Sequence, residues 1–341
     1  IALVEGGRLT DINDALLVFR RDQATGAATY VQSLRDGVSG ANGLDGVKSV
    51  VISSDGAHLY TAGEYGDELG VFSRDAATGQ LTFVTSFTNG SGGVTGLDGP
   101  RSVTLSPDGN QLYVVGTDLA VFNRNPATGQ LTFATSLTTP SSAYSVAVSG
   151  DGEHLYVADA VDSSVLVYDR DPATGSLTYL EKVQDGVGGI DGLATVHSVW
   201  VSPDGKHVYA ASYGDNALVA LARNAATGSL TMVQMFKDGQ GGIDSLSQAN
   251  TVTVSPDGSN VYVAAYNDDT ITVFHRNAAT GELTYLQQFR EGSGGMTSLD
   301  GAYFVAVSPD GKHVYSASYV DDALTVFSRD GRPPTPAPHA V

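Results

Sequence analysis

The chain of 341 residues contains no cysteine, only three methionines and a single tryptophan. The absence of cysteine excludes disulfide bonds, thiolate metal sites and a cysteine nucleophile. No run of 18 apolar residues occurs, so no segment is expected to cross a membrane as a helix. Several classes of function are therefore excluded before any motif is considered.

Positive charge is scarce as well. Lysine and arginine together number 18 against 37 aspartates and glutamates, which gives a net charge of −19. The negative electrostatic field of such a protein repels phosphate backbones and anionic lipids. Neither nucleic acid nor a membrane surface is therefore the expected partner. The sequence starts at Ile1 without a basic and apolar leader, which fits either a removed signal peptide or a trimmed sequence. With its acidic, cysteine-free and glycine-rich composition, the protein is expected to be extracellular or periplasmic.

A unit of about 53 residues recurs along the whole chain. Each copy reads Ser-Val-x-Val-Ser-Pro-Asp-Gly-x-His-x-Tyr, then a short acidic turn, then x-Val-Phe-x-Arg-Asp/Asn-x-Ala-Thr-Gly-x-Leu-Thr, then a glycine-rich loop. Positions that agree between copies are expected to be structural, whereas positions that differ can carry a specific function. The Ser-Pro-Asp-Gly-like segments start at Ser53, Ser106, Ser149, Ser202, Ser255 and Ser308.

Each copy has the pattern of four short strands. Apolar and polar residues alternate over four to six positions, a period of two that indicates strands. Each strand ends at turn residues such as Pro-Asp-Gly or Ala-Thr-Gly. Four antiparallel strands per copy predict an all-β fold, a seven-bladed β-propeller of four-stranded antiparallel blades. Residues 1–34 supply the first blade, in which residues 1–10 are expected to form a shortened hairpin that turns at Gly6 and Gly7.

The array runs without a break in composition, so one propeller domain is predicted over residues 1–331. The remaining residues, 332–341, form a proline-rich C-terminal tail. Because proline cannot donate to a central ladder, this tail cannot supply the outer strand of the last blade. The last blade is therefore predicted to lack that strand.

Three sets of residues are of types common in active sites, but each set recurs once per copy. They are therefore interpreted as structural. Histidines lie two residues before a tyrosine in the second strand, and blades arranged around an axis would keep them apart, so they are not expected to share a metal. The arginines before the third turn are expected to form ion pairs between blades or to brace turns, and the tyrosines to pack. The sets are His58, His154, His207 and His313; Arg21, Arg74, Arg124, Arg170, Arg223, Arg276 and Arg329; and Tyr60, Tyr113, Tyr156, Tyr209, Tyr262 and Tyr315.

The long glycine-rich loops and the short acidic turns are expected on one face, which varies between copies and is rich in carboxylates. Carboxylates and free carbonyls in such loops are ligands that Ca²⁺ prefers, and Asp185, Asp191, Asp238 and Asp244 are the candidate metal ligands. In the alternative interpretation, glycine supplies positive-φ turns and aspartate caps them. The sequence leaves both interpretations open.

One position at the start of the innermost strand is not repeated between copies. A mixture of cations, an imidazole, an amide and phenols at one convergent position indicates a pocket for a small polar or anionic molecule, or a surface for another protein, at the mouth of a central channel. The end of the second strand lies close by and adds a carboxylate and more tyrosines. The first set is Lys48, Arg101, Tyr144, His197, Asn250 and Tyr303, and the second includes Glu64, Tyr213, Tyr266 and Tyr319.

The repeat resembles the lactonase-type seven-bladed propellers, the family of 6-phosphogluconolactonase and carboxymuconate lactonising enzyme. The likeness rests on Ser-Pro-Asp-Gly-x-x-x-Tyr, Val-Phe-x-Arg-Asp and Ala-Thr-Gly-x-Leu, and it covers nearly the whole chain. It implies a catalytic set of His197, Arg101 and Glu64. Two residues depart from the family's pattern, because Ser102 replaces a histidine after the arginine and Thr117 stands where that blade carries glutamate.

Two functions are compatible with these observations. The first is a binding or interaction scaffold that uses the acidic loop face and the channel mouth. The alternative is a lactone-hydrolysing or lactonising enzyme, in which His197 carries a proton while Arg101 and Lys48 hold a carboxylate or a developing oxyanion. A copper or redox enzyme needs several convergent histidines, and only His197 is expected near the axis.

Overall fold

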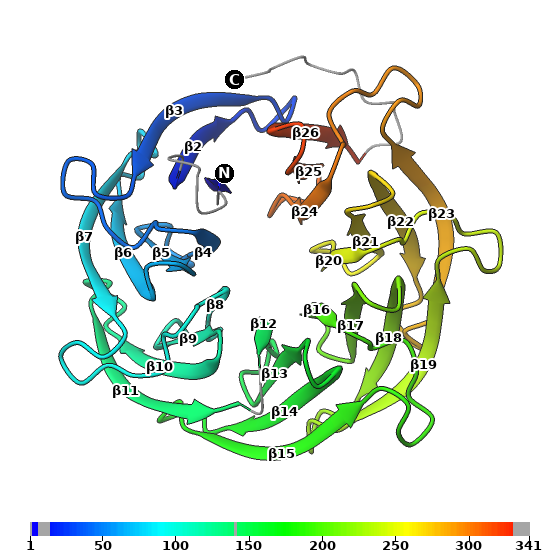
Figure 1. Cartoon of the computed structure of the whole chain (residues 1–341), viewed down its shortest axis with the longest axis horizontal. Coiled ribbons are helices and arrows are strands. Elements are labelled where there is room, and N and C mark those ends of the chain that lie inside the picture. Colours follow the sequence, from blue (N-terminus) through cyan, green and yellow to red (C-terminus); the bar gives the residue numbers. More distant parts are fainter. Residues whose placement is uncertain (1, 6–13, 140–141, 330–341) are drawn as a thin grey trace. The chain divides into compact units, whose positions relative to one another are not determined.

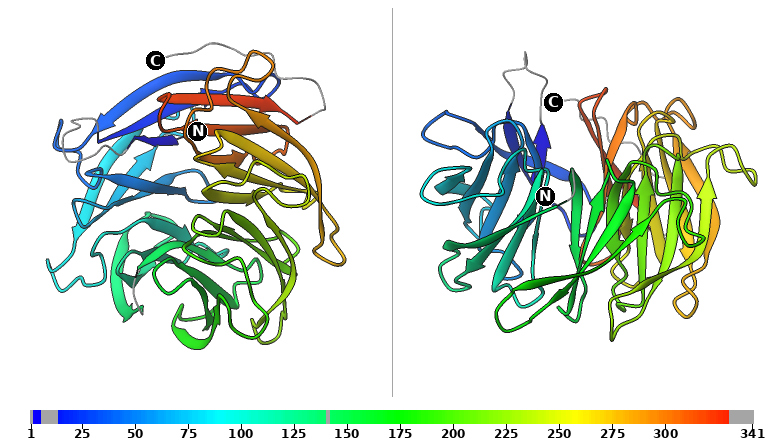
Figure 2. Two further views of the ribbon diagram at one scale, coloured as in Figure 1. Left: turned by 45° about the vertical axis from the view of Figure 1, so that its right-hand side comes forward. Right: turned by 60° about the horizontal axis from the view of Figure 1, so that its bottom comes forward.

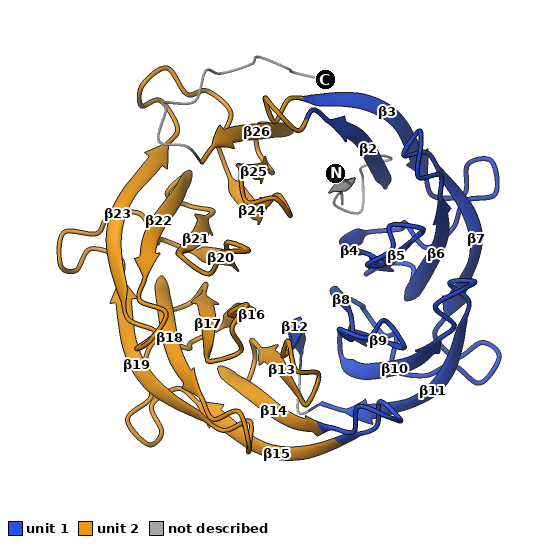
Figure 3. Ribbon diagram, turned by 180° about the vertical axis from the view of Figure 1, so that it is seen from behind, with its two compact units in different colours: residues 1–22, 28–148, 170–177 blue, residues 23–27, 149–169, 178–341 orange. Residues whose placement is uncertain are grey.

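The computed structural model describes residues 2–5, 14–139 and 142–329, and in these residues all regular structure is β-strand. The chain divides into two compact units, which Figure 3 distinguishes by colour. Unit 1 comprises Ile1–Asp22, Ala28–Val148 and Arg170–Leu177, and unit 2 comprises Gln23–Ala27, Ser149–Asp169 and Thr178–Val341. A single domain over residues 1–331 stays a prediction, and the tail 332–341 lies outside the described residues. Among the residues searched, no helix of the length and hydropathy needed to cross a membrane was found.

The repeat that forms β16 (Val196–Val201), β17 (His207–Ser212), β18 (Ala217–Arg223) and β19 (Leu230–Lys237) shows how sequence becomes structure. These strands pair antiparallel in the order β16-β17-β18-β19 (Figures 1 and 2). The turn between β16 and β17 is closed by Ser202, whose Oγ lies 2.6 Å from Asp204 Oδ1 and accepts a hydrogen bond from the His207 amide. The strands and the turn lie where the sequence predicts them.

Unit 2 contains two further complete sheets of described strands. One has four strands in the order β20-β21-β22-β23, and the other has three in the order β24-β25-β26. The fourth repeat gives β13 and nearly all of β14 and β15 to unit 2. The bounds are β13 (His154–Asp159), β14 (Ser164–Arg170), β15 (Leu177–Gln184), β20 (Ala249–Val254), β21 (Asn260–Ala265), β22 (Thr270–Arg276), β23 (Leu283–Arg290), β24 (Ala302–Val307), β25 (His313–Ser318) and β26 (Ala323–Ser328).

Unit 1 contains the sheets β1-β2-β3, β4-β5-β6-β7 and β11-β10-β9-β8, and also β12. In the first sheet β1 pairs with β2, while the turn predicted at Gly6 and Gly7 lies outside the described residues. The bounds are β1 (Ala2–Glu5), β2 (Ala15–Arg21), β3 (Ala28–Arg35), β4 (Val47–Ile52), β5 (His58–Gly63), β6 (Glu68–Arg74), β7 (Leu81–Thr88), β8 (Ser102–Leu105), β9 (Gln111–Val115), β10 (Asp118–Arg124), β11 (Leu131–Thr138) and β12 (Ala143–Val148).

The core lies between successive sheets of a unit. In unit 2, Tyr209 and Leu218 of one sheet pack with Val252, Val261 and Phe274 of the next, and all five are buried. The apolar members of the period-two pattern therefore fill the space between neighbouring repeats, and burial of such side chains is the main favourable term in folding.

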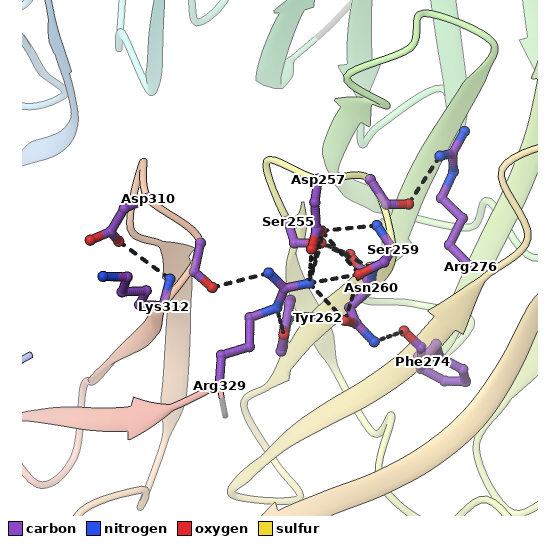
Figure 4. A network of polar contacts seen from close by, with 12 residues as sticks. Ser255, Asp257, Ser259, Asn260, Tyr262, Phe274, Arg276, Asp310, Lys312 and Arg329 are labelled. Carbon is purple, nitrogen blue, oxygen red and sulfur yellow. Dashed lines mark hydrogen bonds and ion pairs between the residues drawn. The ribbon is translucent and has the colours of Figure 1, made fainter. Parts of the chain in front are cut away.

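A buried polar contact, here called the Arg–Tyr staple, also joins successive repeats. Tyr209 donates its hydroxyl proton to the carbonyl oxygen of Gly281 (3.1 Å) and accepts a hydrogen bond from Arg276 Nε (2.8 Å). Arg276 Nη2 donates to both carboxylate oxygens of Asp204 (2.7 and 2.9 Å). The same Arg–Tyr contact joins Arg124 to Tyr60, Arg170 to Tyr113, Arg223 to Tyr156 and Arg329 to Tyr262, the last drawn in Figure 4. For these residues the predicted scaffold role is confirmed.

The pKa shifts of Tyr156 and His207 give these side chains the protonation states that the Arg–Tyr staple requires. Burial raises the pKa of Tyr156 to about 12, so the phenol keeps its proton and can donate. Burial and, next, the charge of Arg276 lower the pKa of His207, so its imidazole is neutral near pH 7 and its Nδ1 accepts a hydrogen bond from Arg276 Nη2 (2.8 Å). The repeated histidines His154 and His207 thus contact a guanidinium, which confirms their structural interpretation.

Replacement of the staple arginine is expected to destabilise the protein. Arg276→Ala leaves the Tyr209 hydroxyl, the His207 ring and Asp204 without their shared donor, at a cost of about 2–4 kcal/mol of unfolding free energy. Denaturant titration measures this cost. The exposed Arg20 provides the control, because Arg20→Ala is expected to change stability by less than about 0.5 kcal/mol. Equal losses in the two variants would contradict the staple.

The staple also predicts a pH dependence. Partial burial of Asp204 acts to raise its pKa, but hydrogen bonds from Arg276, Ser202 and the Lys206 amide outweigh it and lower the pKa to about 2. A carboxylate with a depressed folded-state pKa contributes stability above its unfolded pKa, and this contribution is lost as pH falls through the folded value. The melting temperature of the parent should therefore fall between about pH 4 and pH 2 more steeply than that of Asp204→Asn. Parallel curves would contradict this assignment.

Candidate functional site

Three of the predicted site residues meet in unit 1. Lys48 lies in β4, Glu64 follows β5, and Arg101 directly precedes β8. Glu64 Oε1 accepts a hydrogen bond from Arg101 Nε at 2.7 Å, and its Oε2 lies 3.4 Å from Lys48 Nζ. We call Lys48, Glu64 and Arg101 the cationic cluster, because two cations share one carboxylate and the group keeps a net positive charge.

Neighbouring side chains orient the two cations. Arg101 Nη1 donates a hydrogen bond to Ser142 Oγ, and its guanidinium carbon lies 4.4 Å from the centre of the Tyr144 ring. Lys48 Nζ lies 5.4 Å from the centre of the Tyr65 ring. The sequence predicted Tyr144 but missed Ser142 and Tyr65, although Tyr65 directly follows Glu64 in the chain.

The cationic cluster can bind an anion. Arg101 Nη2 has no hydrogen-bond partner among the described residues, and a quarter of the Arg101 side chain is exposed to solvent. A guanidinium held by Nε and Nη1 can present its remaining donor to a carboxylate or an oxyanion with little loss of side-chain entropy. The chain as a whole carries a net charge of −19, so a local group with positive charge is an exception to its negative electrostatic field.

The predicted ligand-binding residues other than Lys48 and Tyr144 lie in unit 2, together with His197. His197 Nδ1 lies 2.8 Å from Asn250 Oδ1, and Asn250 Nδ2 donates to the carbonyl oxygen of Tyr303 at 2.9 Å. Because Asn250 Oδ1 accepts, the neutral His197 ring carries its proton on Nδ1 and its lone pair on Nε2. The ring also stacks on Tyr213, with centroids 4.6 Å apart. The contacts with Asn250 and Tyr213 therefore hold the imidazole in one orientation.

Tyr266, Tyr303 and Tyr319 form a cluster of mutually packed rings in the same unit. Their centroids lie 6.1 to 6.3 Å apart, a usual spacing for aromatic pairs in direct contact. No group fits between rings at this distance, so any ligand would meet their outer surface. Tyr319 is the most accessible of the three, with 46% of its surface exposed.

Two of the four predicted calcium ligands, Asp185 and Asp238, cap glycine-rich loops. Asp185 accepts a hydrogen bond from the amide of Leu193 (2.9 Å), and Asp238 accepts one from the amide of Leu246 (2.9 Å). In each case the amide lies eight residues further along the chain. The same contact is made by Asp36 with Leu44 and by Glu291 with Leu299. The repeated geometry supports the interpretation in which acidic residues cap turns.

The structure groups the acidic residues differently from the prediction. Among the described residues, Asp185 and Asp191 have carboxylate oxygens close to those of Asp215, whereas Asp238 and Asp244 do not join this group. Asp215 is already paired with Lys237 Nζ at 2.8 Å and accepts the Ala194 amide at 3.0 Å. A lysine ammonium thus supplies the positive charge beside these carboxylates.

A second group consists of Asp151, Glu153 and His154. Arg223 Nη2 donates to Asp151 at 2.8 Å and to His154 Nδ1 at 2.7 Å, so two of the three residues belong to an Arg–Tyr staple. A guanidinium therefore already contacts Asp151 and His154. In both groups a cationic side chain lies beside the carboxylates, and calcium binding stays a prediction.

The capping role can be tested with Asp185→Ala. Loss of the hydrogen bond to the Leu193 amide should cost about 1 kcal/mol of unfolding free energy, equally with and without EDTA. The exposed Asp244 provides the control, because Asp244→Ala should leave stability within about 0.5 kcal/mol of the parent. A parent protein that EDTA destabilises, and an Asp185→Ala variant that EDTA does not affect, would show a calcium ligand instead.

The sequence matches the protein family described as lactonase, 7-bladed β-propeller, over residues 9–148 and 145–299. These segments span most of the chain, so the protein belongs to this family, and the resemblance seen in the sequence is confirmed. A search of curated proteins finds no match.

Solved structures with the same fold include three from bacteria. A periplasmic gluconolactonase of Pseudomonas aeruginosa gives a TM-score of 0.79 at 20% identity and covers 99% of this chain and 95% of its own. A putative 6-phosphogluconolactonase of Bacteroides uniformis gives 0.77 at 20% identity, covering 97% and 92%, and one of Bacteroides fragilis gives 0.77 at 16%, covering 96% and 90%. Identities this low show the fold alone, and they confirm an all-β propeller.

Proposed function

We propose that this protein hydrolyses the ring ester of a lactone related to the sugar acids. Membership of the lactonase family favours this enzymatic interpretation over a non-catalytic scaffold. The observation that carries the proposal is the cationic cluster, in which Glu64 holds Arg101 and Lys48 as a preformed positive site. Function resides in the site rather than the fold, so the family alone is not sufficient.

The chemistry requires stabilisation of a negative charge. Water adds to the lactone carbonyl carbon, whose oxygen becomes an oxyanion, and collapse of this intermediate breaks the bond to the ring oxygen. The ring oxygen takes up one proton of the water, and the product is a hydroxy acid. Cationic donors fixed before the reaction stabilise the oxyanion without reorganisation. Arg101 and Lys48 can supply these donors, and Glu64 acts as their positioning residue.

For His197, which lies in unit 2, the role of proton carrier stays a prediction from the family resemblance. An imidazole can take a proton from water and return it to a leaving oxygen, and Asn250 Oδ1 lies 2.8 Å from Nδ1 of this ring. Asn250 would then orient the imidazole as a positioning residue.

Several broader features belong to the same proposal. Seven blades, the number in the family description, are part of the proposal because the sequence repeat predicts them. We infer an extracellular or periplasmic location from the acidic, cysteine-free composition. A small anionic or polar molecule is the proposed ligand.

Arg101→Ala is expected to lower kcat/KM for the best lactone of a panel by about 100-fold or more, because it removes a donor to the oxyanion. Arg101→Lys should keep part of the activity, since it retains the charge but not the donor geometry. Lys182, whose ion pair with Asp162 lies at the surface of unit 2, provides the control, and Lys182→Ala should match the parent. A pH-indicator assay measures hydrolysis.

His197→Ala, assayed in the same panel, should also lose turnover while its melting temperature stays near that of the parent. Two results would overturn the proposal. If the folded parent hydrolyses no lactone of the panel, the scaffold interpretation is favoured. If Arg101→Ala retains full activity, the cationic cluster does not contact the reacting group.

A further inference from the structure

Two Asn-Gly pairs occur in the sequence, at Asn42 and at Asn89. An asparagine in such a pair can lose its side-chain amide when the backbone nitrogen of the next residue attacks it, and glycine has no Cβ to hinder the attack. Both pairs lie in glycine-rich loops of unit 1, the first between β3 and β4 and the second between β7 and β8 (Figure 1). The surroundings of the two pairs differ.

Hydrogen bonds of the loop protect Asn89. Its Oδ1 accepts a hydrogen bond from the amide of Leu97 at 3.3 Å. The amide of Gly90 donates to the carbonyl oxygen of Val94 at 2.8 Å. Attack by the Gly90 nitrogen would break both contacts, and a backbone carbonyl is a poor acceptor for the proton that this nitrogen must lose.

The side chain of Asn42 has no such restraint. It is exposed and forms no hydrogen bond in the described part of the chain. The amide of Gly43 donates to no backbone carbonyl among the described residues, and it lies close enough to Glu68 of β6 to act on the pKa of that carboxyl. Burial has the largest effect on Glu68 and raises its pKa, which makes the carboxylate a better proton acceptor.

The equivalent residue of a loop in unit 2 shows the geometry of this position. Asp191 stands where Asn42 stands in its own loop, and glycine follows both residues. Asp191 Oδ1 lies 2.9 Å from the amide nitrogen of Gly192. Gly43 and Gly192 have similar φ values of +82° and +90°. A loop of this conformation therefore brings the side-chain carbonyl group close to the nitrogen that would attack it.

We propose that Asn42 is a site of spontaneous deamidation, in which Glu68 acts as the base. The Gly43 nitrogen bonds to Cγ of Asn42 while Glu68 takes the amide proton. The bond from Cγ to Nδ2 then breaks, and the proton leaves with this nitrogen as ammonia. Water opens the resulting succinimide ring at either carbonyl, so that residue 42 becomes aspartate or isoaspartate. The reaction consumes only water, and it does not depend on lactone hydrolysis.

Isoaspartate is expected to disturb the packing of the loop, because it adds one methylene to the backbone beside Gly43. A Cβ added at Gly43 would lie 2.5 Å from the Cα of Gly70 in β6, so the backbone fits closely there. The carbonyl oxygen of Gly43 also accepts a hydrogen bond from Thr61 Oγ1 at 2.7 Å. The melting temperature should therefore fall as isoaspartate accumulates.

The folded protein, incubated at mildly alkaline pH and sampled over time, provides the test. Trypsin releases residues 36–48 with Asn42 and residues 75–101 with Asn89, and mass spectrometry measures the replacement of NH₂ by OH in each peptide. Asn42 should convert about 10-fold faster than Asn89 or more, because two hydrogen bonds must break at Asn89. In urea both residues should convert at similar rates, since only the local sequence then acts.

Glu68→Gln should slow the conversion of Asn42 by about 10-fold or more, because a glutamine amide cannot take up the proton. Asp118, the equivalent first residue of β10, provides the matched control, and Asp118→Asn should leave the rate at Asn42 unchanged. The Arg101→Ala variant should convert as the parent does, which separates this result from lactone hydrolysis. An intact Asn42, equal rates at Asn42 and Asn89 in the folded protein, or an unchanged rate in Glu68→Gln would overturn the proposal.

Discussion

The hydrogen bond from a staple arginine to the tyrosine of the preceding repeat is the contact on which the rest of the structure depends. It joins residues 67 positions apart in unit 2, for example Arg276 to Tyr209. Burial of a guanidinium is costly unless its donors are satisfied, and here the tyrosine hydroxyl, a glycine carbonyl and an aspartate satisfy them. The staple thus fixes how one sheet packs on the next, so that the starts of the inner strands recur at equivalent places within each unit.

This constraint separates scaffold from function. At a position that the scaffold does not need, side chains are free to differ, and the differing residues are the ones that assemble into polar groups. In unit 1 these are Lys48 and Arg101, held by Glu64, and in unit 2 they are His197 and Asn250. A protein with a net charge of −19 repels anions in general, so a preformed cation pair is the simplest means of attracting one.

Much of the fold could be predicted from the sequence because local signals agreed in every copy. Alternation located strands such as β16, and Pro-Asp-Gly located the turn after it. The contact between Glu64 and Arg101 was harder to predict, because it joins the end of one repeat's second strand to the start of the next repeat's inner strand, 37 residues away. Asp185 shows another limit: the same carboxylate serves a metal or a backbone amide, and only the position of the Leu193 amide decides.

The central claim is that repeated positions build the scaffold while an unrepeated position binds the ligand. The most direct test is an NMR titration of the arginine Nε–H signals with a sugar acid such as gluconate, which resembles the hydrolysis product. We predict a saturable shift of the Arg101 signal, with the signals of the staple residues Arg124 and Arg276 unchanged. An unshifted Arg101 signal, or equal shifts at the staple arginines, would contradict the account.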